Sequence, residues 1–457
     1  MDADVLIVGG GLAGLGCGLI LAEQGKRVTV LEARDVLGGR TSSWEENGML
    51  VESGFHKVIG YYKVLPELLS RAGVSLDEIV AWETSMEIRL PDGEGEGKFG
   101  IAPGKAPFRT VAGMLGNNDF LPPGAKASLV PFFAAGFRDL DERPDELDRI
   151  SVAAYARRHE VTKEAVERLL VPLTAGILFL PPEHYSARVF FSIFSPGLSR
   201  FAEMKVGAFK GGMTEVMALP LAGAIVRMGG TVRTGAPVRS LLGGEAGIEG
   251  VQLEDGSQLR ASHTVVAVPV RAAQRLIGEQ LGGHDWFAPM LRLETMEDCT
   301  FQAELNEPLL PKDRTTFGPG TCLGSFSEQS RTTFRHVPGR ISAILTPPGP
   351  LRGLPPEEAF ARIAGEAARL GLPLDSHTVR WRIVSREADF ASVQPGQAAL
   401  RPSQATPVPG LSLAGDYTDQ PMFYTMEGAA ISGVRAAEAV LGRCLGSLSM
   451  APGGTAG

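Results

Sequence analysis

The segment from residue 4 to residue 40 constrains the fold of this chain most, because a strand, a glycine-rich turn, a helix and a second strand follow one another without interruption. A continuous apolar run, residues 5–8, predicts a strand buried on both faces. The spacing G-x-G-x-x-G then runs from Gly9 through Gly11 to Gly14, and a helix is expected over residues 12–24. Unpaired N–H groups and the helix dipole favour negative charge at such a helix N-terminus, so the pattern predicts a dinucleotide phosphate site.

An acidic residue at the end of the second strand completes this unit. The strand is expected over residues 27–31, and Glu32 lies 23 positions after Gly9. This separation is close to the offset of about 20 residues at which a carboxylate holds a ribose hydroxyl. A glycine-rich turn on its own also occurs for packing alone, but the complete series favours a dinucleotide site. It does not distinguish NAD from FAD.

Length and charge limit the classes of protein. A chain of 457 residues exceeds what one hydrophobic core usually serves, so we expect two structural units. A net charge of −8 argues against a nucleic-acid partner. The four cysteines are scattered without C-x-x-C spacing, so we expect no metal site, no disulfide framework and a reducing, cytoplasmic setting.

No run of about 18 apolar residues is present, and the first predicted strand begins close to Met1, so we expect neither a membrane span nor a signal peptide. Two shorter apolar stretches, residues 127–137 and 169–182, lie in a region with a helical pattern. Three interpretations stay open for them. They form a helical core, the wall of an apolar substrate tunnel, or a patch that attaches the protein peripherally to the inner face of a membrane.

The chain leaves the nucleotide-binding pattern and returns to it twice. Strands are expected at 230–233 and 237–240, a hairpin at 248–259 and a buried strand at 263–269. We therefore assign residues 1–80, 205–275 and 386–445 to a discontinuous nucleotide-binding domain, 81–204 and 276–385 to an inserted substrate domain, and 446–457 to a flexible tail. Ligands commonly bind between such domains.

The third nucleotide-binding segment covers residues 411–441. A strand at 411–414 leads into the turn Gly415-Asp416, and Met426-Glu427-Gly428-Ala429 opens a helix. A second helix N-terminus would then face the same ligand as the first. Asp416 is a candidate for holding a ligand hydroxyl.

These motifs resemble those of one family. LEARDVLGGR and the segments LAGDYTDQ and TMEGAAISG are similar to plant and cyanobacterial phytoene and ζ-carotene desaturases, FAD proteins of the amine oxidase superfamily, with bacterial hydroxysqualene dehydroxylases nearby. Residues 185–194 and 52–56 are similar to the ISAR…IF and ETGLH stretches of ζ-carotene desaturases. The resemblance implies an α/β fold, with a Rossmann-like FAD-binding domain and an inserted α+β substrate domain.

The resemblance also implies an activity. An FAD-dependent desaturase takes hydride from a C–C bond of a long isoprenoid to flavin N5 and passes the electrons to a quinone-like acceptor. The FAD-binding residues that the resemblance implies, together with the glycine motif, are Gly9, Gly11, Leu12, Ala13, Gly14, Glu32, Ala33, Arg34, Gly38, Gly39, Arg40, Gly54, Phe55, His56, Val238, Gly415, Asp416, Met426, Glu427, Gly428 and Ala429.

Three side chains are catalytic candidates. His56 follows Gly54, which the resemblance places against the flavin, although a lone histidine is often structural. Arg200 is similar to an arginine near the flavin in this family. The family has a tyrosine just before its SMEG motif, where this chain has Met422, and the nearest tyrosine is Tyr424. Hydroxysqualene dehydroxylase, flavin amine oxidase and a non-enzymatic FAD-binding protein remain as alternatives.

Overall fold

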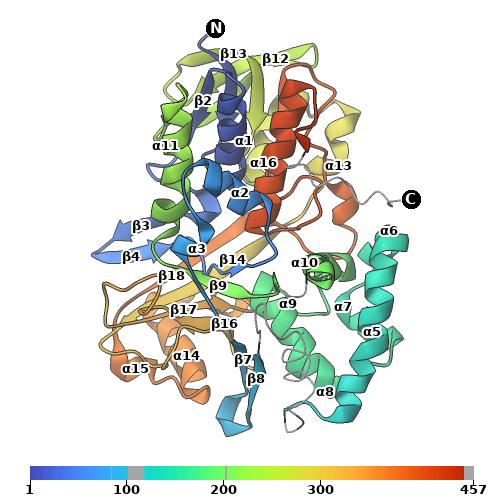
Figure 1. Cartoon of the computed structure of the whole chain (residues 1–457), viewed down its shortest axis with the longest axis vertical. Helices are drawn as coiled ribbons and strands as arrows, with labels where there is room; N and C mark the ends of the chain where they lie inside the picture. The colour runs from blue at the N-terminus through green and yellow to red at the C-terminus, as the bar shows by residue number, and fades with distance from the viewer. Residues whose placement is uncertain (84, 101–117, 119, 201–202, 447–457) are drawn as a thin grey trace.

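The computed structural model describes residues 1–457 except 84, 101–117, 119, 201–202 and 447–457. The tail expected over 446–457 therefore lies almost wholly outside the described residues. Within them the chain folds into two large sheets, with helices packed on both and a separate group of helices beside the second sheet (Figure 1).

The first sheet contains the predicted strand–helix–strand unit. Its parallel centre places β1 between β2 and β13, as predicted for the strand that returns after residue 260. One difference is that residues 258–266 form a single strand, where the sequence pattern indicated two separate pieces. The strand order is β10 (Thr231–Arg233), β2 (Val28–Leu31), β1 (Ala3–Val8), β13 (Gln258–Val266), β12 (Gly247–Leu253) and β11 (Val238–Gly244), with β19 (Leu411–Leu413) also paired to β13.

Helix α1 is almost completely buried, which explains its lack of a polar face. It packs between the first sheet and other helices, and a Cβ on Gly433 would lie 2.3 Å from the carbonyl oxygen of Ala13, so only glycine permits this approach to α16. The helices on this side are α1 (Leu12–Glu23), α2 (Val64–Arg71), α11 (Leu219–Arg227) and α16 (Met426–Leu441), with short α3 (Leu76–Ile79) (Figure 1). Helix α12 (Val270–Leu281) packs on β11, and α13 (Ala288–Leu291) packs on α12.

The second sheet joins strands from two distant segments of the chain, because β7 pairs in parallel with β15. Residues 96–100 form the edge strand β8. Strand β18 runs across position 386, the predicted boundary of the third nucleotide-binding segment, and stays in this sheet along its whole length. The order is β18 (Thr378–Ala391), β14 (Thr295–Leu305), β17 (Gly339–Leu345), β16 (Leu323–Glu328), β15 (Thr316–Phe317), β7 (Ser85–Arg89) and β8 (Glu96–Gly100). The division of the chain into two domains at the predicted boundaries stays a prediction.

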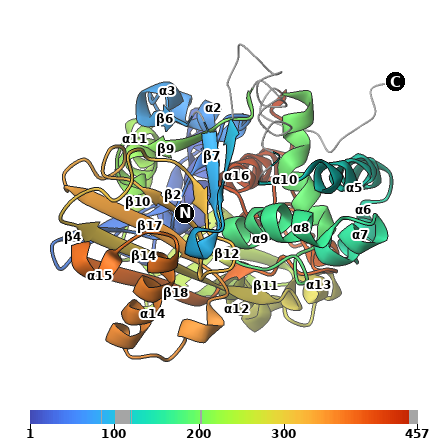
Figure 2. The ribbon, with the colours of Figure 1, turned by 90° about the horizontal axis from the view of Figure 1, so that it is seen from below.

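Helices cover the two faces of the second sheet. On one face lie α14 (Pro356–Arg369) and α15 (Leu374–His377). On the other lies α9, where the Ser325 hydroxyl donates a hydrogen bond of 2.6 Å to the carbonyl of Gly176. Figure 2 shows α9 between this sheet and the remaining helices of the group, which are α5 (Pro123–Glu142), α6 (Pro144–Asp148), α7 (Val152–Arg158), α8 (Lys163–Ala165), α9 (Val171–Leu178) and α10 (Ala187–Ser199).

Two small sheets connect the large ones. Strands β3 (Ser43–Glu46) and β4 (Met49–Glu52) form a hairpin, and β9 (Val206–Phe209) pairs with β5 (Val58–Ile59) and β6 (Val80–Trp82). The chain between β4 and β5 carries the predicted Gly54 and His56. The α/β class predicted from the sequence is confirmed.

Candidate functional site

A cavity of about 1170 Å³ lies between the first sheet, the second sheet and helices α5, α9 and α10. Its volume exceeds the range of about 300–1000 Å³ that is usual for drug-sized ligands. It therefore has room for a large ligand and a second molecule beside it. One end is lined by the glycine-rich turns of the first sheet, and the other by apolar side chains of the helices.

The glycine turn after β1 leaves an open cradle at the N-terminus of α1. A Cβ on Gly11 would meet no protein atom closer than 3.9 Å, whereas a Cβ on Gly14 would lie 2.0 Å from the carbonyl oxygen of Gly9. Gly14 thus serves packing, while Gly11 borders the cavity. No side chain caps the N-terminus of α1, so its first backbone N–H groups remain available for phosphate oxygens.

The segment after Glu32 closes over this cradle. The Glu32 carboxylate accepts hydrogen bonds from the backbone N–H groups of Gly10, at 2.8 Å, and Arg34, at 2.9 Å. Gly38 donates its N–H to the carbonyl of Gly10 at 2.9 Å, and both Gly38 and Gly39 have positive φ angles. Only glycine adopts this backbone without strain, which explains the repeated glycine.

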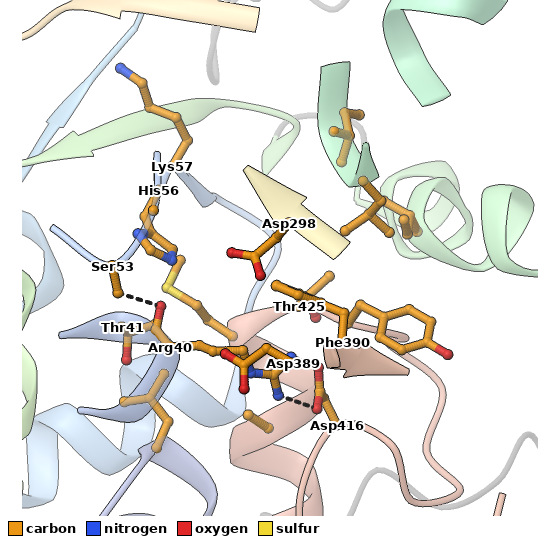
Figure 3. A pocket seen from close by; sticks show the side chains of 18 of the residues that line it. Arg40, Thr41, Ser53, His56, Lys57, Asp298, Asp389, Phe390, Asp416 and Thr425 are labelled. Atoms are coloured by element: carbon orange, nitrogen blue, oxygen red, sulfur yellow. Dashed lines mark hydrogen bonds and ion pairs between the residues drawn. The ribbon is translucent and has the colours of Figure 1, made fainter. Parts of the chain in front are cut away.

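Arg40 links the front of the chain to its third nucleotide-binding segment. Its guanidinium forms an ion pair with Asp416 and lies 4.5 Å from the centre of the Phe390 ring (Figure 3). Residues 376 positions apart are thus joined at the cavity wall. The predicted site residues that line the cavity are Gly9, Gly11, Leu12, Ala13, Glu32, Ala33, Arg34, Gly38, Gly39, Arg40, Gly54, Phe55, His56, Val238, Gly415, Asp416, Tyr424, Met426 and Ala429.

The structure places Gly14, Glu427, Gly428 and Arg200 outside the cavity lining. The Glu427 carboxylate instead accepts three backbone N–H groups at the start of α2, and burial raises its pKa. A Cβ on Gly428 would lie 2.1 Å from the carbonyl oxygen of Met422, so this glycine serves packing. Arg200 donates to the carbonyl of Tyr61 at 2.7 Å.

The other two catalytic candidates do line the cavity. Burial, together with the positive charges of Arg386 and Arg40, lowers the pKa of His56 to about 4, so its imidazole is neutral at physiological pH. Its Nδ1 atom is buried without a hydrogen-bond partner. The Tyr424 hydroxyl donates to the carbonyl of Ser392 at 2.7 Å.

Several charged residues of the cavity wall carried no sequence motif. Asp298 comes from β14, and Arg386 and Asp389 come from β18. Arg386 Nη1 lies 3.3 Å from Asp389 Oδ2 and 3.5 Å from Asp298 Oδ2. Burial raises the pKa of Asp298 to about 7. Figure 3 shows Asp298 and Asp389 near Arg40 and His56.

The opposite end of the cavity is apolar. The two stretches singled out in the sequence supply much of its wall, and Val130 and Leu198, which also line it, are 66% and 58% exposed. In the part of the chain that the structure describes, no helix is both long and apolar enough to cross a membrane. The apolar lining includes Leu129, Phe133, Phe137, Leu169, Leu173, Ile177, Leu178, Phe179, Phe194, Phe317 and Ile344.

Comparison with known proteins assigns the family. Residues 12–441 match the family of flavin containing amine oxidoreductases. The chain belongs to this family. It is an FAD-dependent oxidoreductase, as predicted from the FAD motifs.

Curated relatives match over almost the whole length. The chain is 26% identical to 15-cis-phytoene desaturase of Synechococcus elongatus, over 96% of either chain. It is also 26% identical to zeta-carotene desaturase of a Synechocystis species, over 96% of this chain and 97% of that protein. The predicted resemblance to phytoene and ζ-carotene desaturases is thereby confirmed.

Solved structures of other proteins share the fold. An oxidoreductase from Methanosarcina mazei superposes with a TM-score of 0.75 at 19% identity, over 94% of this chain and 98% of that one. Putrescine oxidase bound to putrescine superposes with a TM-score of 0.74 at 19% identity, over 97% of this chain and 100% of that one.

The residues of the polar end fit FAD. The uncapped N-terminus of α1 and the open face of Gly11 suit a pyrophosphate, because they offer N–H donors and no obstructing side chain. Glu32 lies at the end of β2, in the position for a ribose. At the third segment the N-terminus of α16 reaches the cavity through Met426 and Ala429.

Proposed function

We propose that this protein desaturates a long isoprenoid hydrocarbon by an FAD-dependent hydride abstraction. The observation that carries the proposal is that one cavity has both an FAD-compatible end and an apolar end. A hydrocarbon offers nothing to hydrogen-bond, so such an enzyme must orient its substrate by packing against apolar side chains. The identity with two carotene desaturases supports the same substrate class.

In this proposal the residues of the polar end hold the cofactor and those of the apolar end hold the substrate. Gly11, Gly39 and the N-terminus of α1 bind the pyrophosphate, and the pair Arg40–Asp416 fixes the two nucleotide-binding segments against each other. Phe133, Phe179 and Ile344 align the chain of the substrate and exclude water. Bound FAD supplies the hydride acceptor.

The test is anaerobic reduction of the bound flavin. We expect phytoene or ζ-carotene to reduce the flavin and bleach its absorbance at a rate that permits turnover. Simple amines should leave the absorbance unchanged. The same flavin assay with hydroxysqualene distinguishes a hydroxysqualene dehydroxylase from a desaturase. Bleaching by amines alone would refute the proposal and favour an amine oxidase.

We propose that the reduced flavin passes its electrons to a quinone. An apolar cavity that admits an isoprenoid also admits the isoprenoid-tailed quinones, so both partners can reach the same site. Stopped-flow reoxidation of the photoreduced protein should be faster with a lipid quinone than with oxygen. Equal or slower reoxidation by the quinone would count against this acceptor.

We propose that the open end of the cavity contacts a membrane surface. Val130 on α5 and Leu198 on α10 line the cavity and are exposed, as expected for groups at an entrance from a bilayer. Leu198→Asp should weaken flotation with liposomes. Val226→Asp, which changes a residue 53% exposed on α11, is the matched control. Equal flotation of the two variants would contradict this entrance.

A further inference from the structure

Asp298 carries a buried carboxyl group at the wall of the cavity. The residue is 2% exposed and lines the cavity, and its Oδ1 atom is buried without a hydrogen-bond partner. The other oxygen lies 3.5 Å from Arg386 Nη1, too far for a good hydrogen bond. Leaving a buried carboxyl oxygen unpartnered is costly, so its presence at a ligand cavity indicates a role that involves the ligand.

The neighbouring charges of the cavity are engaged elsewhere. Arg40 pairs with Asp416, and Asp389 pairs with Arg386. Lys57 Nζ lies 2.8 Å from Glu83 Oε1 and 2.7 Å from Asp313 Oδ1. Of the described lining residues, only His56 and Asp298 have a buried side-chain N or O atom without a partner.

Between these two groups the charge environment favours Asp298 as a base. Burial and two cationic neighbours hold His56 in a neutral form of low basicity, with a pKa of about 4. Burial and the negative charge of Asp389 raise the pKa of Asp298, and the charges of Arg386 and Arg40 oppose the rise, so that it reaches about 7. A base is most effective when its pKa lies near the working pH.

We propose that Asp298 is the catalytic base that accepts the proton released when the substrate becomes unsaturated. This inference rests on the proposed desaturation. One C–H bond breaks and its electron pair leaves with the hydrogen as hydride to FAD. The adjacent C–H bond breaks, its electron pair forms the new C=C bond, and its proton goes to the carboxylate of Asp298.

The carboxylate assists this step in a second way. Departure of hydride leaves positive charge on the polyene, and a negative group in a dry cavity stabilises such charge more strongly than water does. The apolar lining excludes the water that would otherwise take the proton.

Asp298→Asn is the test, because it keeps the shape of the side chain and removes the base. Glu297→Gln is the matched control, since Glu297 is adjacent on β14 and pairs with Arg352 outside the cavity lining. With equal FAD content, we expect Asp298→Asn to slow anaerobic flavin reduction by phytoene or ζ-carotene at least about 100-fold. Glu297→Gln should stay at the wild-type rate.

The wild-type protein provides two further readouts. Its rate of flavin reduction should rise with pH to a plateau, with an apparent pKa near neutrality. Infrared difference spectra of the FAD-loaded protein at acidic and alkaline pH should contain a protonated-carboxyl band that titrates in the same range and is absent from Asp298→Asn. If that variant does not fold, the wild-type pH profile still decides.

The outcomes separate this inference from the proposed function. No flavin reduction by any isoprenoid in the wild type refutes the desaturation itself. Reduction in the wild type that is independent of pH, or an Asp298→Asn variant as fast as wild type, overturns the assignment of Asp298 while the desaturation stands.

Discussion

Glu427 allows a direct test of a structural role against a cofactor role. The sequence motif placed it among the FAD-binding residues, but the structure turns its carboxylate toward the first turn of α2. There it accepts the backbone N–H groups of Lys63 at 2.7 Å, Val64 at 2.8 Å and Leu65 at 2.9 Å. These are N-terminal donors that α2 cannot satisfy internally, and the lysine before α2 supplies no side-chain cap.

The expected loss follows from these three bonds. Removing the carboxylate with Glu427→Ala leaves three N–H groups unpaired, two of them buried and one part-buried. The penalty for a buried group is about 1–3 kcal/mol, and single substitutions rarely cost more than about 5 kcal/mol, so the free energy of unfolding should fall by about 3–5 kcal/mol. Glu427→Gln keeps one oxygen but turns an amide donor toward the N–H of Leu65, and should cost about 2–3 kcal/mol. At about 1 kcal/mol per degree for a chain of this length, the melting temperature of the Ala variant should fall by about 3–5 °C.

Thermal unfolding is measured with and without FAD, and FAD affinity is measured separately. If Glu427 caps α2, the variants lose similar stability in both forms. Glu67→Gln on the exposed side of α2 is the control, because its ion pair with Arg71 is half-exposed and contributes about 0.5 kcal/mol. Unchanged stability of the FAD-free variants together with a large loss of FAD affinity would refute the capping role.

Three further outcomes are expected. Gly11→Val should lose FAD absorbance with the fold intact. Gly14→Ala should lose stability as well, because its Cβ would meet the Gly9 carbonyl oxygen. Equal unfolding temperatures of the two FAD-free variants would contradict this contrast. The raised pKa of Asp298 predicts that its carboxyl contributes about 4 kcal/mol to the free energy of unfolding below about pH 4, and that this contribution is lost as the pH rises to about 7. Urea unfolding across this pH range should show the loss in the wild type and not in Asp298→Asn. Tyr424→Phe should cost only about 1 kcal/mol in the same unfolding assay, since its hydroxyl is already donated to Ser392.

The local parts of the site were predictable from the sequence. The strand, glycine turn, helix and Glu32 lie within one short segment, and their geometry depends on steric rules that operate over a few residues. The same holds for the helix that begins at Met426. Arg40 and Asp416 were both identified, although their ion pair spans most of the chain.

Side-chain direction was harder to predict than position. Glu427 lies in a cofactor motif, yet its carboxylate faces α2, because α2 happens to begin beside it. Arg200 follows the apolar helix α10 and is held by the carbonyl of Tyr61. The apolar stretch in α5 contributes both to the core, through Phe132, and to the cavity wall, through Phe133, and a periodic pattern does not separate these two faces.

Asp298 illustrates the limit most clearly, because its placement depends on a strand irregularity. The register between β14 and β18 shifts between Met296 and Asp298, so that Asp298 pairs with Arg386 while Met296 pairs with Phe390. Such bulges re-aim side chains and are frequent beside active sites. This one gathers Asp298, Arg386 and Asp389 at the cavity wall, although no motif joins the two strands. The feature that distinguishes the cavity chemically therefore arises from sheet pairing between distant segments, and only the folded structure brings it into view.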